Sequence, residues 1–131
     1  MTTNDTTTDD ARPQTPVTII TNSARFALGQ IVATPGALAL LQATGRSAAC
    51  LLARHMHADF GDTCRDDSAL NELAITDGSR IMSVYRLVDA EKLKATPKPK
   101  RADLPTVWVI TDGTNADGKR EYTTLLLPED Y

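Results

Sequence analysis

The sequence predicts an α+β fold, in which about three helices pack on a small antiparallel β-sheet that ends in a C-terminal hairpin. One strand pattern comes first, a series of helical patterns follows, and three strand patterns come last. Residues 107–111 and 122–127 are rich in β-branched and aromatic or apolar side chains, and segment 112–120 between them is rich in turn formers. These two strands form the expected hairpin, and Pro128 ends the second of them.

The composition indicates one soluble domain. The chain of 131 residues has room for one domain of ordinary size, and its 41% hydrophobic and 5% aromatic content predicts a mainly aliphatic core. The net charge of −3 argues against general binding to phosphate backbones and permits a partner with a basic surface. No apolar run reaches the ~18 residues of a membrane span, and no secretory signal is visible. We therefore expect a cytoplasmic protein in which Cys50 and Cys64 are reduced thiols, with a disulfide as the less favoured alternative.

The beginning of the chain divides into a tail and the start of the domain. Residues 1–16 are rich in threonine and aspartate and have almost nothing to bury, which predicts a disordered tail. Residues 17–131 are expected to form the domain, in which the β-branched run 17–20 either adds an edge strand or stays loose. Residues 25–33 are expected to be the first real strand, and Gly29 indicates a bulge or a close backbone approach.

The first expected helix follows this strand directly. Thr34 is a suitable N-cap, Pro35 fits the first helical position, and Gly45 fits a left-handed C-cap. Leu38 and Leu41 are expected to face inward.

Two further helices are expected before the next strand. Ser47 caps the first of them, which runs to about Asp59. Its expected buried stripe consists of Ala48, Leu51, Leu52, His55 and Asp59. Asp62 or Thr63 caps the second, which Gly78 ends. Its expected buried face consists of Ala69, Leu70, Leu73 and Ala74.

Residues 79–88 alternate as a strand with two distinct faces. One face carries Ile81, Ser83, Tyr85 and Leu87. The other face carries Met82, Val84, Arg86 and Val88. Segment 89–105, which follows this strand, contains three prolines and several basic residues, and it predicts an exposed, partly extended loop inserted between two strands.

His55, His57 and Asp59 lie close together in the sequence and raise the question of a metal site. On a helix, His55 and Asp59 share a face, whereas His57 points about 200° away from His55. No His-Glu-x-x-His or Cys-x-x-Cys spacing supplies further ligands. We therefore expect no metal and no cofactor, and we interpret His55 as a partly buried histidine at a helix–sheet contact.

Hydroxyl groups on the strands permit a catalytic interpretation. Small ribonucleases and toxins pack a helix on an antiparallel sheet whose open face carries His, Arg, Tyr or Ser/Thr side chains. The residues that would form such a site here are His55, Arg80, Ser83, Tyr85, Thr111 and Thr123. In it, arginines would stabilise the negative charge of the transition state. Threonine and tyrosine are also ordinary strand residues, and this simpler interpretation is favoured.

The inserted segment 89–105 holds the main concentration of positive charge. Its candidate binding residues are Lys98, Lys100 and Arg101, which could contact the phosphates of a nucleic acid. No aromatic residue is interleaved for base stacking, so a solvated, proline-stiffened loop is the favoured interpretation.

Six segments of the sequence carry a resemblance to a known group of proteins. They are GQIVATPGAL (29–38), LARH (52–55), FGD (60–62), SRIMSVY (79–85), VWVIT (107–111) and TTLLLPEDY (123–131). Together they resemble short proteins carried by bacterial plasmids, integrative elements and related mobile DNA. The resemblance covers nearly everything after Phe26 except segments 89–105 and 113–119, which look longer than the usual connections of that group.

The resemblance implies a mobile-element context and no established chemistry. Automatic labels sometimes call such proteins type I restriction methylase subunits, but an adenine methyltransferase needs a glycine-rich nucleotide-binding turn and an Asn-Pro-Pro-aromatic motif. The sequence contains neither of them. It is also too short for that fold.

We therefore expect a cytoplasmic accessory protein of a mobile element that binds another protein, in element maintenance or in evasion of host defence. The alternative is an RNA-binding domain or a metal-independent ribonuclease. Hydroxyls, a histidine and arginines on one open face of the sheet would favour the nuclease, whereas a covered or apolar face would favour binding. The oligomeric state does not follow from the sequence.

Overall fold

The structure is a computed structural model that describes residues 24–131. It confirms the α+β class, because helices pack on one four-stranded sheet. The strands are β1 (Gln30–Ala33), β2 (Ile81–Arg86), β3 (Thr106–Thr111) and β4 (Tyr122–Leu126). The helices are α1 (Pro35–Thr44), α2 (Ala48–Met56), α3 (Arg65–Asp77) and α4 (Ala90–Ala95), with 3-10 helices η1 (Lys98–Asp103) and η2 (Pro128–Asp130). The expected tail 1–16 and the run 17–20 lie outside the described residues.

The sheet has the strand order β1-β4-β3-β2 and is mixed rather than antiparallel. β3 pairs antiparallel with both β2 and β4, which confirms the hairpin, but β1 pairs parallel with β4. The wholly antiparallel expectation was wrong because α1, α2 and α3 form a long crossover between β1 and β2. Such a helical connection lets the next strand start at the same end of the sheet and run in the same direction.

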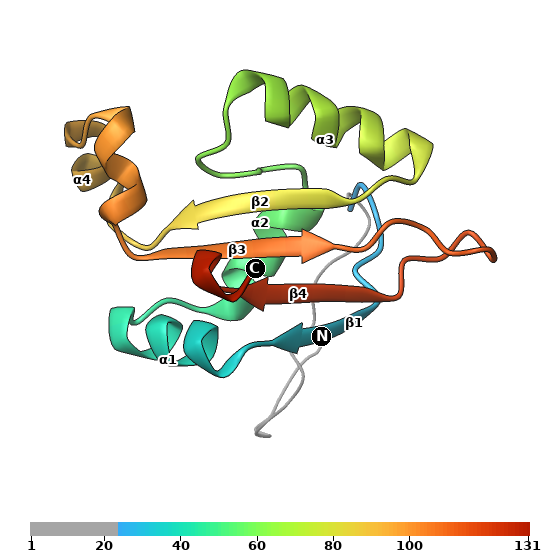
Figure 1. The fold of residues 1–131 in the computed structure, drawn as a ribbon, viewed down its shortest axis with the longest axis horizontal. Helices are drawn as coiled ribbons and strands as arrows, with labels where there is room; N and C mark the ends of the chain where they lie inside the picture. The colour runs from blue at the N-terminus through green and yellow to red at the C-terminus, as the bar shows by residue number, and fades with distance from the viewer. Residues whose placement is uncertain (1–23) are drawn as a thin grey trace, which may run out of the picture.

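The two faces of the sheet are covered very differently (Figure 1). α2 lies behind the strands, α1 contacts β4, and α3 runs along the outer side of β2. The inner face, turned toward α2, carries Ile81, Ser83, Tyr85, Val107, Val109, Thr111, Thr123 and Leu125, which are all buried. The open face carries Met82, Val84, Trp108, Ile110 and Leu126. The 3-10 helix η2 lies in front of the open face. The expected alternation of residues 81–88 is confirmed on the inner side, where Ile81, Ser83, Tyr85 and Leu87 are all buried.

Helix α1 begins and ends where the sequence predicts. The Thr34 hydroxyl accepts a hydrogen bond from the backbone N–H of Ala37, and Gly45 ends the helix with a left-handed φ of 67°. Leu41 is buried as expected, but Leu38 is 53% exposed. The stripe that faces the core contains Ala37 and Leu41, and Leu38 lies about 100° away from Ala37 around the helix axis.

The ends of the next two helices differ from expectation. α2 ends before Asp59 because Ala58 takes a left-handed φ of 67°. The N-cap of α3 is Cys64, whose sulfur accepts a bond from the N–H of Asp67, rather than Asp62 or Thr63. The two cysteines are free and exposed.

The buried face of α3 also differs from the expected one. Asn71 and Ala74 are its buried residues, while Leu70 and Leu73 are each 63% exposed and Ala69 also faces solvent. The reason is that the Asn71 amide bonds to both backbone groups of Met82 on β2, which turns the helix about its axis.

Strand β1 is shorter than expected because residues 25–29 do not pair. Phe26 and Leu28 are buried in this segment, and Gly29 has a φ of 67°. A Cβ atom on Gly29 would lie 2.4 Å from the carbonyl oxygen of Arg120, which confirms the expected close approach of two backbones.

The inserted segment 89–105 is not a partly extended loop, because it contains α4 and η1. The Arg101 side chain holds this segment by bonding to Asp62 and to the carbonyl of Thr96. Among the helices of residues 24–131, none alone has the length and apolar character of a membrane span, although α1 and α2, bent by 106° at their junction, meet that criterion as a pair.

Candidate functional site

Four of the six side chains of the catalytic hypothesis meet in the core. His55 of α2 lies with Nδ1 2.6 Å from the Ser83 hydroxyl of β2 and Nε2 2.8 Å from the Thr111 hydroxyl of β3. The Thr111 hydroxyl is 2.7 Å from that of Thr123 on β4, which donates to the carbonyl of Leu28 at 2.6 Å. The four side chains form one chain of hydrogen bonds, and all four residues are 0% exposed.

The direction of every bond in this polar chain follows from the hydrogens available. The Thr123 hydroxyl has one hydrogen and donates it to the Leu28 carbonyl, so the Thr111 hydroxyl must donate to that of Thr123. Thr111 then accepts from Nε2–H of His55, and Nδ1 of His55 accepts the hydroxyl hydrogen of Ser83. Each hydroxyl and both ring nitrogens are thereby satisfied with a neutral imidazole.

The surroundings of His55 also favour its neutral form. Burial lowers the pKa of His55 to about 3, and the nearby positive charge of Arg120 acts in the same direction. The Phe26 ring packs edge-on against the imidazole, with the ring centres 5.1 Å apart. A general acid or base must reach its substrate, and His55 in this structure is sealed between α2 and the sheet.

The other two residues of the catalytic hypothesis are placed differently. Tyr85 is buried on the inner face, where its hydroxyl donates to the carbonyl of Asp59 at 2.6 Å and burial raises its pKa. Arg80 lies at the open face, where its guanidinium donates to the hydroxyl of Tyr131 and lies over that ring. The structure therefore separates Arg80 from His55 by the thickness of the sheet.

The three basic residues of the binding hypothesis do not form one cationic surface. Arg101 is largely buried and pairs with Asp62 at 2.8 Å, while the same carboxylate also pairs with Arg86 at 2.9 Å. These two arginines lower the pKa of Asp62 against the opposing effect of its burial. Only Lys98 and Lys100 of the three extend into solvent. Arg101 fastens the inserted segment to the domain.

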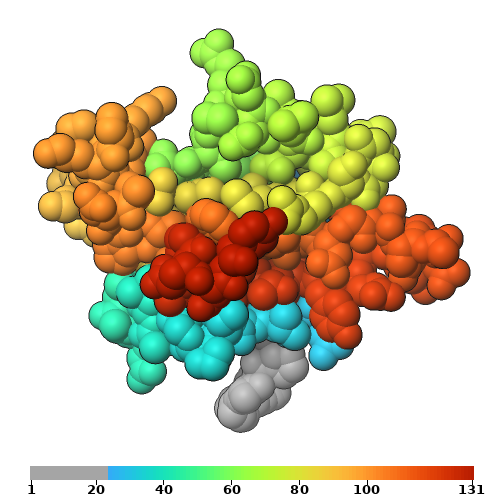
Figure 2. Space-filling view, in the orientation of Figure 1, coloured from blue at the N-terminus to red at the C-terminus, as the bar shows by residue number. Residues whose placement is uncertain are grey.

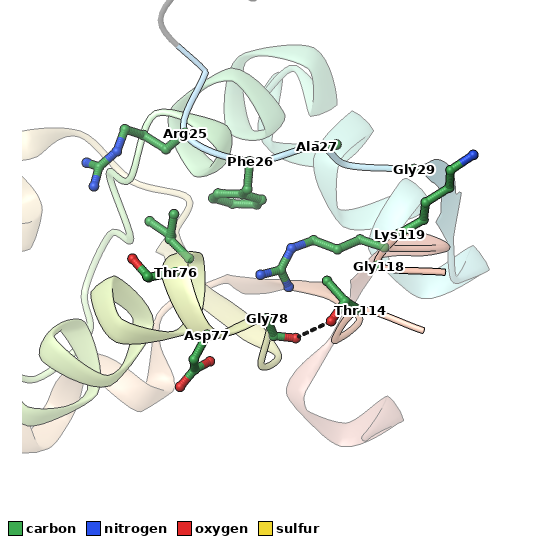
Figure 3. Close-up of a pocket in the computed structure, with 12 residues that line it drawn as sticks. Arg25, Phe26, Ala27, Gly29, Thr76, Asp77, Gly78, Thr114, Gly118 and Lys119 are labelled. Carbon is green, nitrogen blue, oxygen red and sulfur yellow. Dashed lines mark hydrogen bonds between the residues drawn. The ribbon is translucent and has the colours of Figure 1, made fainter. Parts of the chain in front are cut away.

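A cavity of about 630 Å³ lies beside the polar chain, with Phe26 and Gly78 in its lining (Figure 3). Its most buried cation is Arg120, which lies over the Phe26 ring at 5.7 Å. The Arg120 guanidinium donates to three backbone carbonyls, those of Ala74, Ser79 and Asp112. Arg120 therefore ties the end of α3 to the hairpin, and these bonds use three of its five N–H donors.

The open face has a solvent-facing aromatic pair at its centre. The Trp108 and Tyr131 rings pack at a steep angle with their centres 5.5 Å apart, and Tyr131 is 68% exposed. Figure 2 shows the C-terminal turn lying across the middle of this face, with α3 beside it. Trp108 lies on the central strand β3 and is only partly buried.

Two exposed leucines of α3 lie beside the open face. Glu72 of α3 pairs with Arg25, whose backbone N–H bonds to Met56 at the end of α2, so this side of α3 faces the helical layer. Leu70 lies about 160° and Leu73 about 100° around the helix axis from Glu72, so both are turned away from that layer. Strand β2, with Met82 on its open-face side, lies between these leucines and Trp108, and we call the two leucines, Trp108 and Tyr131 together the apolar surface.

Acidic residues border this surface. Asp66 precedes Leu70 by one helical turn and Asp77 follows Leu73 by one turn, so each lies on the same side of α3 as its leucine. Glu129 on η2 is exposed near Tyr131. Three carboxylates therefore lie around the apolar surface, and one cation, Arg80, lies over the Tyr131 ring within it.

Sequence analysis missed the roles of three residues that shape this region. Asn71 is a polar residue outside the expected buried face of α3. Arg120 stood out only as one of the arginines that could stabilise the charge of a transition state, and Tyr131 had only its aromatic character. Their contacts join segments far apart in the sequence, which no local pattern encodes.

Within residues 24–131, no group of three or more histidine, cysteine, aspartate or glutamate side chains is arranged to hold a metal ion. Comparisons with protein-family models, with curated proteins and with solved structures find no match to this chain. The likeness to mobile-element proteins therefore stays a prediction from the sequence, and the α+β fold rests on the structure itself.

Proposed function

We propose that the protein binds another protein through its open face. The observation that carries this proposal is the contrast between the two faces. The histidine and the hydroxyls are sealed inside, while the solvent-facing side presents Trp108, Tyr131, Leu70 and Leu73. Exposed apolar surface that includes aromatic residues is characteristic of protein-binding sites.

The charge around the open face indicates the kind of partner. Asp66, Asp77 and Glu129 border the apolar surface, and the whole chain carries a net charge of −3. A partner that presents an apolar centre with lysines or arginines around it would complement both features, and long-range attraction would speed its association. On the resemblance in the sequence, we place this binding in the cytoplasm, in an accessory protein of a mobile element that serves element maintenance or evasion of host defence.

Site-specific photocrosslinking tests the proposed surface directly. A photoreactive residue at Leu73 should capture a discrete partner protein in cells that carry the gene on its own element, and Leu70→Asp should suppress that adduct. The matched control is the same photoreactive residue at Glu72, which is exposed on the side of α3 that faces Arg25, about 100° around the helix from Leu73. Equal capture from Leu73 and Glu72 would contradict the proposal.

The nuclease alternative is tested on the same protein. Because His55 is buried, we expect purified protein to leave total RNA intact in the absence of metal ions. Metal-independent cleavage by the wild type that disappears in a folded His55→Gln variant would replace the binding proposal with a ribonuclease.

A further inference from the structure

The two edges of the sheet differ in how their backbone groups are satisfied. Along the outer side of β2, the Asn71 amide bonds to the N–H and the carbonyl of Met82 at 3.1 and 2.7 Å. The N–H of Val84 bonds to the carbonyl of Phe60, and its carbonyl accepts from the N–H of Asp62. The β2 edge is therefore closed to further strands.

The edge formed by β1 has no such cover among residues 24–131. The N–H groups of Gln30 and Thr34 bond to carbonyls on the β4 side at 2.8 and 3.0 Å. Because backbone groups alternate in direction along a strand, the N–H and carbonyl groups of Ile31 and Ala33 point away from β4. β1 is the last strand of the sheet, and no described residue pairs with its outer side.

The side chains of β1 do nothing to prevent pairing with another strand. Ile31 is 45% exposed and Val32 is 37% exposed. The strand contains no charged residue and no proline, which are the residues that commonly protect a sheet edge. An uncharged β-branched strand with free backbone groups is a suitable template for strand addition.

We propose that β1 of a second copy of this chain pairs antiparallel with this edge, around a two-fold axis at Val32. In that register Ile31 of each copy lies opposite Ala33 of the other, and each pair exchanges both of its backbone hydrogen bonds. All outward backbone groups of both strands are then satisfied. The register follows from the symmetric position of Ile31 and Ala33 about Val32, and a two-fold pair of this kind is the commonest protein dimer.

The side chains fit the same arrangement. Val32 faces Val32 of the second copy as a non-hydrogen-bonded pair, in which side chains come closest. Because β1 carries no charge, the axis brings no like charges together, although each chain has a net charge of −3. The product is a continuous sheet across two copies. Because β1 has only four residues, the interface is small and the dimer is expected to dissociate on dilution.

Sedimentation equilibrium of the full chain over a wide concentration range tests this dimer. The average mass should rise with concentration toward twice the 14.2 kDa of one chain. Ile31→Pro removes an outward N–H that β4 does not use, so it should keep the fold and raise the dissociation constant at least about tenfold. Gln42→Lys, an added charge on the exposed surface of α1, should leave the dimer unchanged.

Amide hydrogen exchange supplies a second measurement within the wild type. The N–H groups of Ile31 and Ala33 should exchange more slowly at high protein concentration, while that of Val32, which faces β4, should be protected at every concentration. If Ile31→Pro unfolds, Ile31→Lys replaces it as the edge variant.

Three results would overturn the proposal. A constant mass of one chain at all concentrations would show that the edge is free or is occupied by something other than a second copy. A dimer unaffected by both edge variants would place the interface elsewhere. Exchange at Ile31 and Ala33 that does not depend on concentration would show that these groups do not pair across the dimer.

Discussion

The two faces of the sheet differ in how they are covered and in where their hydroxyl groups lie. The inner face combines Ser83, Thr111 and Thr123 with the apolar side chains of the core and is completely covered. The open face carries Trp108 and Ile110 and has only the short turn η2 in front of it. Polarity alone therefore does not indicate which face of a sheet meets solvent. Hydroxyls can lie in a core when each has a hydrogen-bond partner, as in the chain of bonds to His55.

The two faces also suit different functions. On the inner face, the buried polar chain holds α2 in position against three strands, which is a structural role. On the open face, apolar side chains that only η2 lies over can be buried by a partner protein, which would favour binding. If this comparison is right, substitutions on the inner face lower stability, and substitutions on the open face affect binding more than stability.

The largest expected effect comes from His55→Ala on the inner face. The substitution leaves a cavity and deprives the hydroxyls of Ser83 and Thr111 of a partner, so the free energy of unfolding should fall by roughly 3–5 kcal/mol. Urea denaturation followed by circular dichroism measures this loss. A change below about 1 kcal/mol would show that the polar chain contributes little to stability.

The second effect is a loss of stability in mild acid. The pKa of His55 is lowered to about 3 in the folded protein by burial and by Arg120, whereas an unfolded chain has about 6.5. Between these values only the unfolded state binds the proton, so stability falls as the pH drops below about 6.5 and continues to fall to about 3.

This linkage amounts to about 2 kcal/mol between pH 7 and pH 5, at roughly 1.4 kcal/mol per pH unit. Urea midpoints of the wild type at the two pH values should differ accordingly. His55→Gln retains a polar side chain but cannot take up the proton, so its midpoint should change much less. Equal changes in both proteins would assign the acid sensitivity to other groups.

The third effect is smaller and lies on the open face. Trp108→Ala would cost 3–5 kcal/mol in a fully buried site, but Trp108 is only partly buried, so we expect roughly 1.5–2 kcal/mol. Val109→Ala, on the same strand but on the inner face, is the comparison. An open-face loss well above that of Val109→Ala would mean that the open face contributes to the core.

The smallest effect is expected for Tyr131→Ala. Tyr131 is mostly exposed and packs on Trp108, so the free energy of unfolding should fall by about 0.5–1 kcal/mol, which is typical for the loss of one aromatic pair. Because the chain has one tryptophan, its fluorescence reports on this contact alone. The emission should shift to longer wavelength as water reaches the indole. An unchanged spectrum would show that Tyr131 does not shield Trp108 in solution.

Local patterns predicted the parts of the fold that depend on neighbouring residues. The cap at Thr34, the left-handed end at Gly45 and the alternation from Ile81 to Leu87 all follow from interactions within a few residues, and the structure has each of them. The direction of β1 and the buried face of α3 failed because both depend on strands that lie far away in the sequence. Asn71 turns α3 toward β2, and no helical periodicity reveals that bond.

In the candidate site too, features set by neighbouring residues were predicted and features set by distant segments were not. The stripe on α2 correctly placed His55 at a helix–sheet contact, and the strand alternation correctly gathered Ser83, Thr111 and Thr123 near it. Which side of the sheet the helices would cover did not follow from either pattern. That choice decides whether the hydroxyls meet solvent, so the sequence left both functional interpretations open.

The parallel pairing of β1 with β4 has a consequence for how the chain folds. Leu28 and Thr123, which bond across this region, are 95 residues apart in the sequence. The antiparallel strands β3 and β4 close a short hairpin. Pairing of β1 with β4 closes the longest loop in the sheet, so it costs the most conformational entropy. We therefore expect β2, β3 and β4 to assemble early and β1 to dock in the slowest step. Until it docks, the side of β4 that β1 will cover is unpaired, and the lifetime of that intermediate governs how readily the refolding chains aggregate.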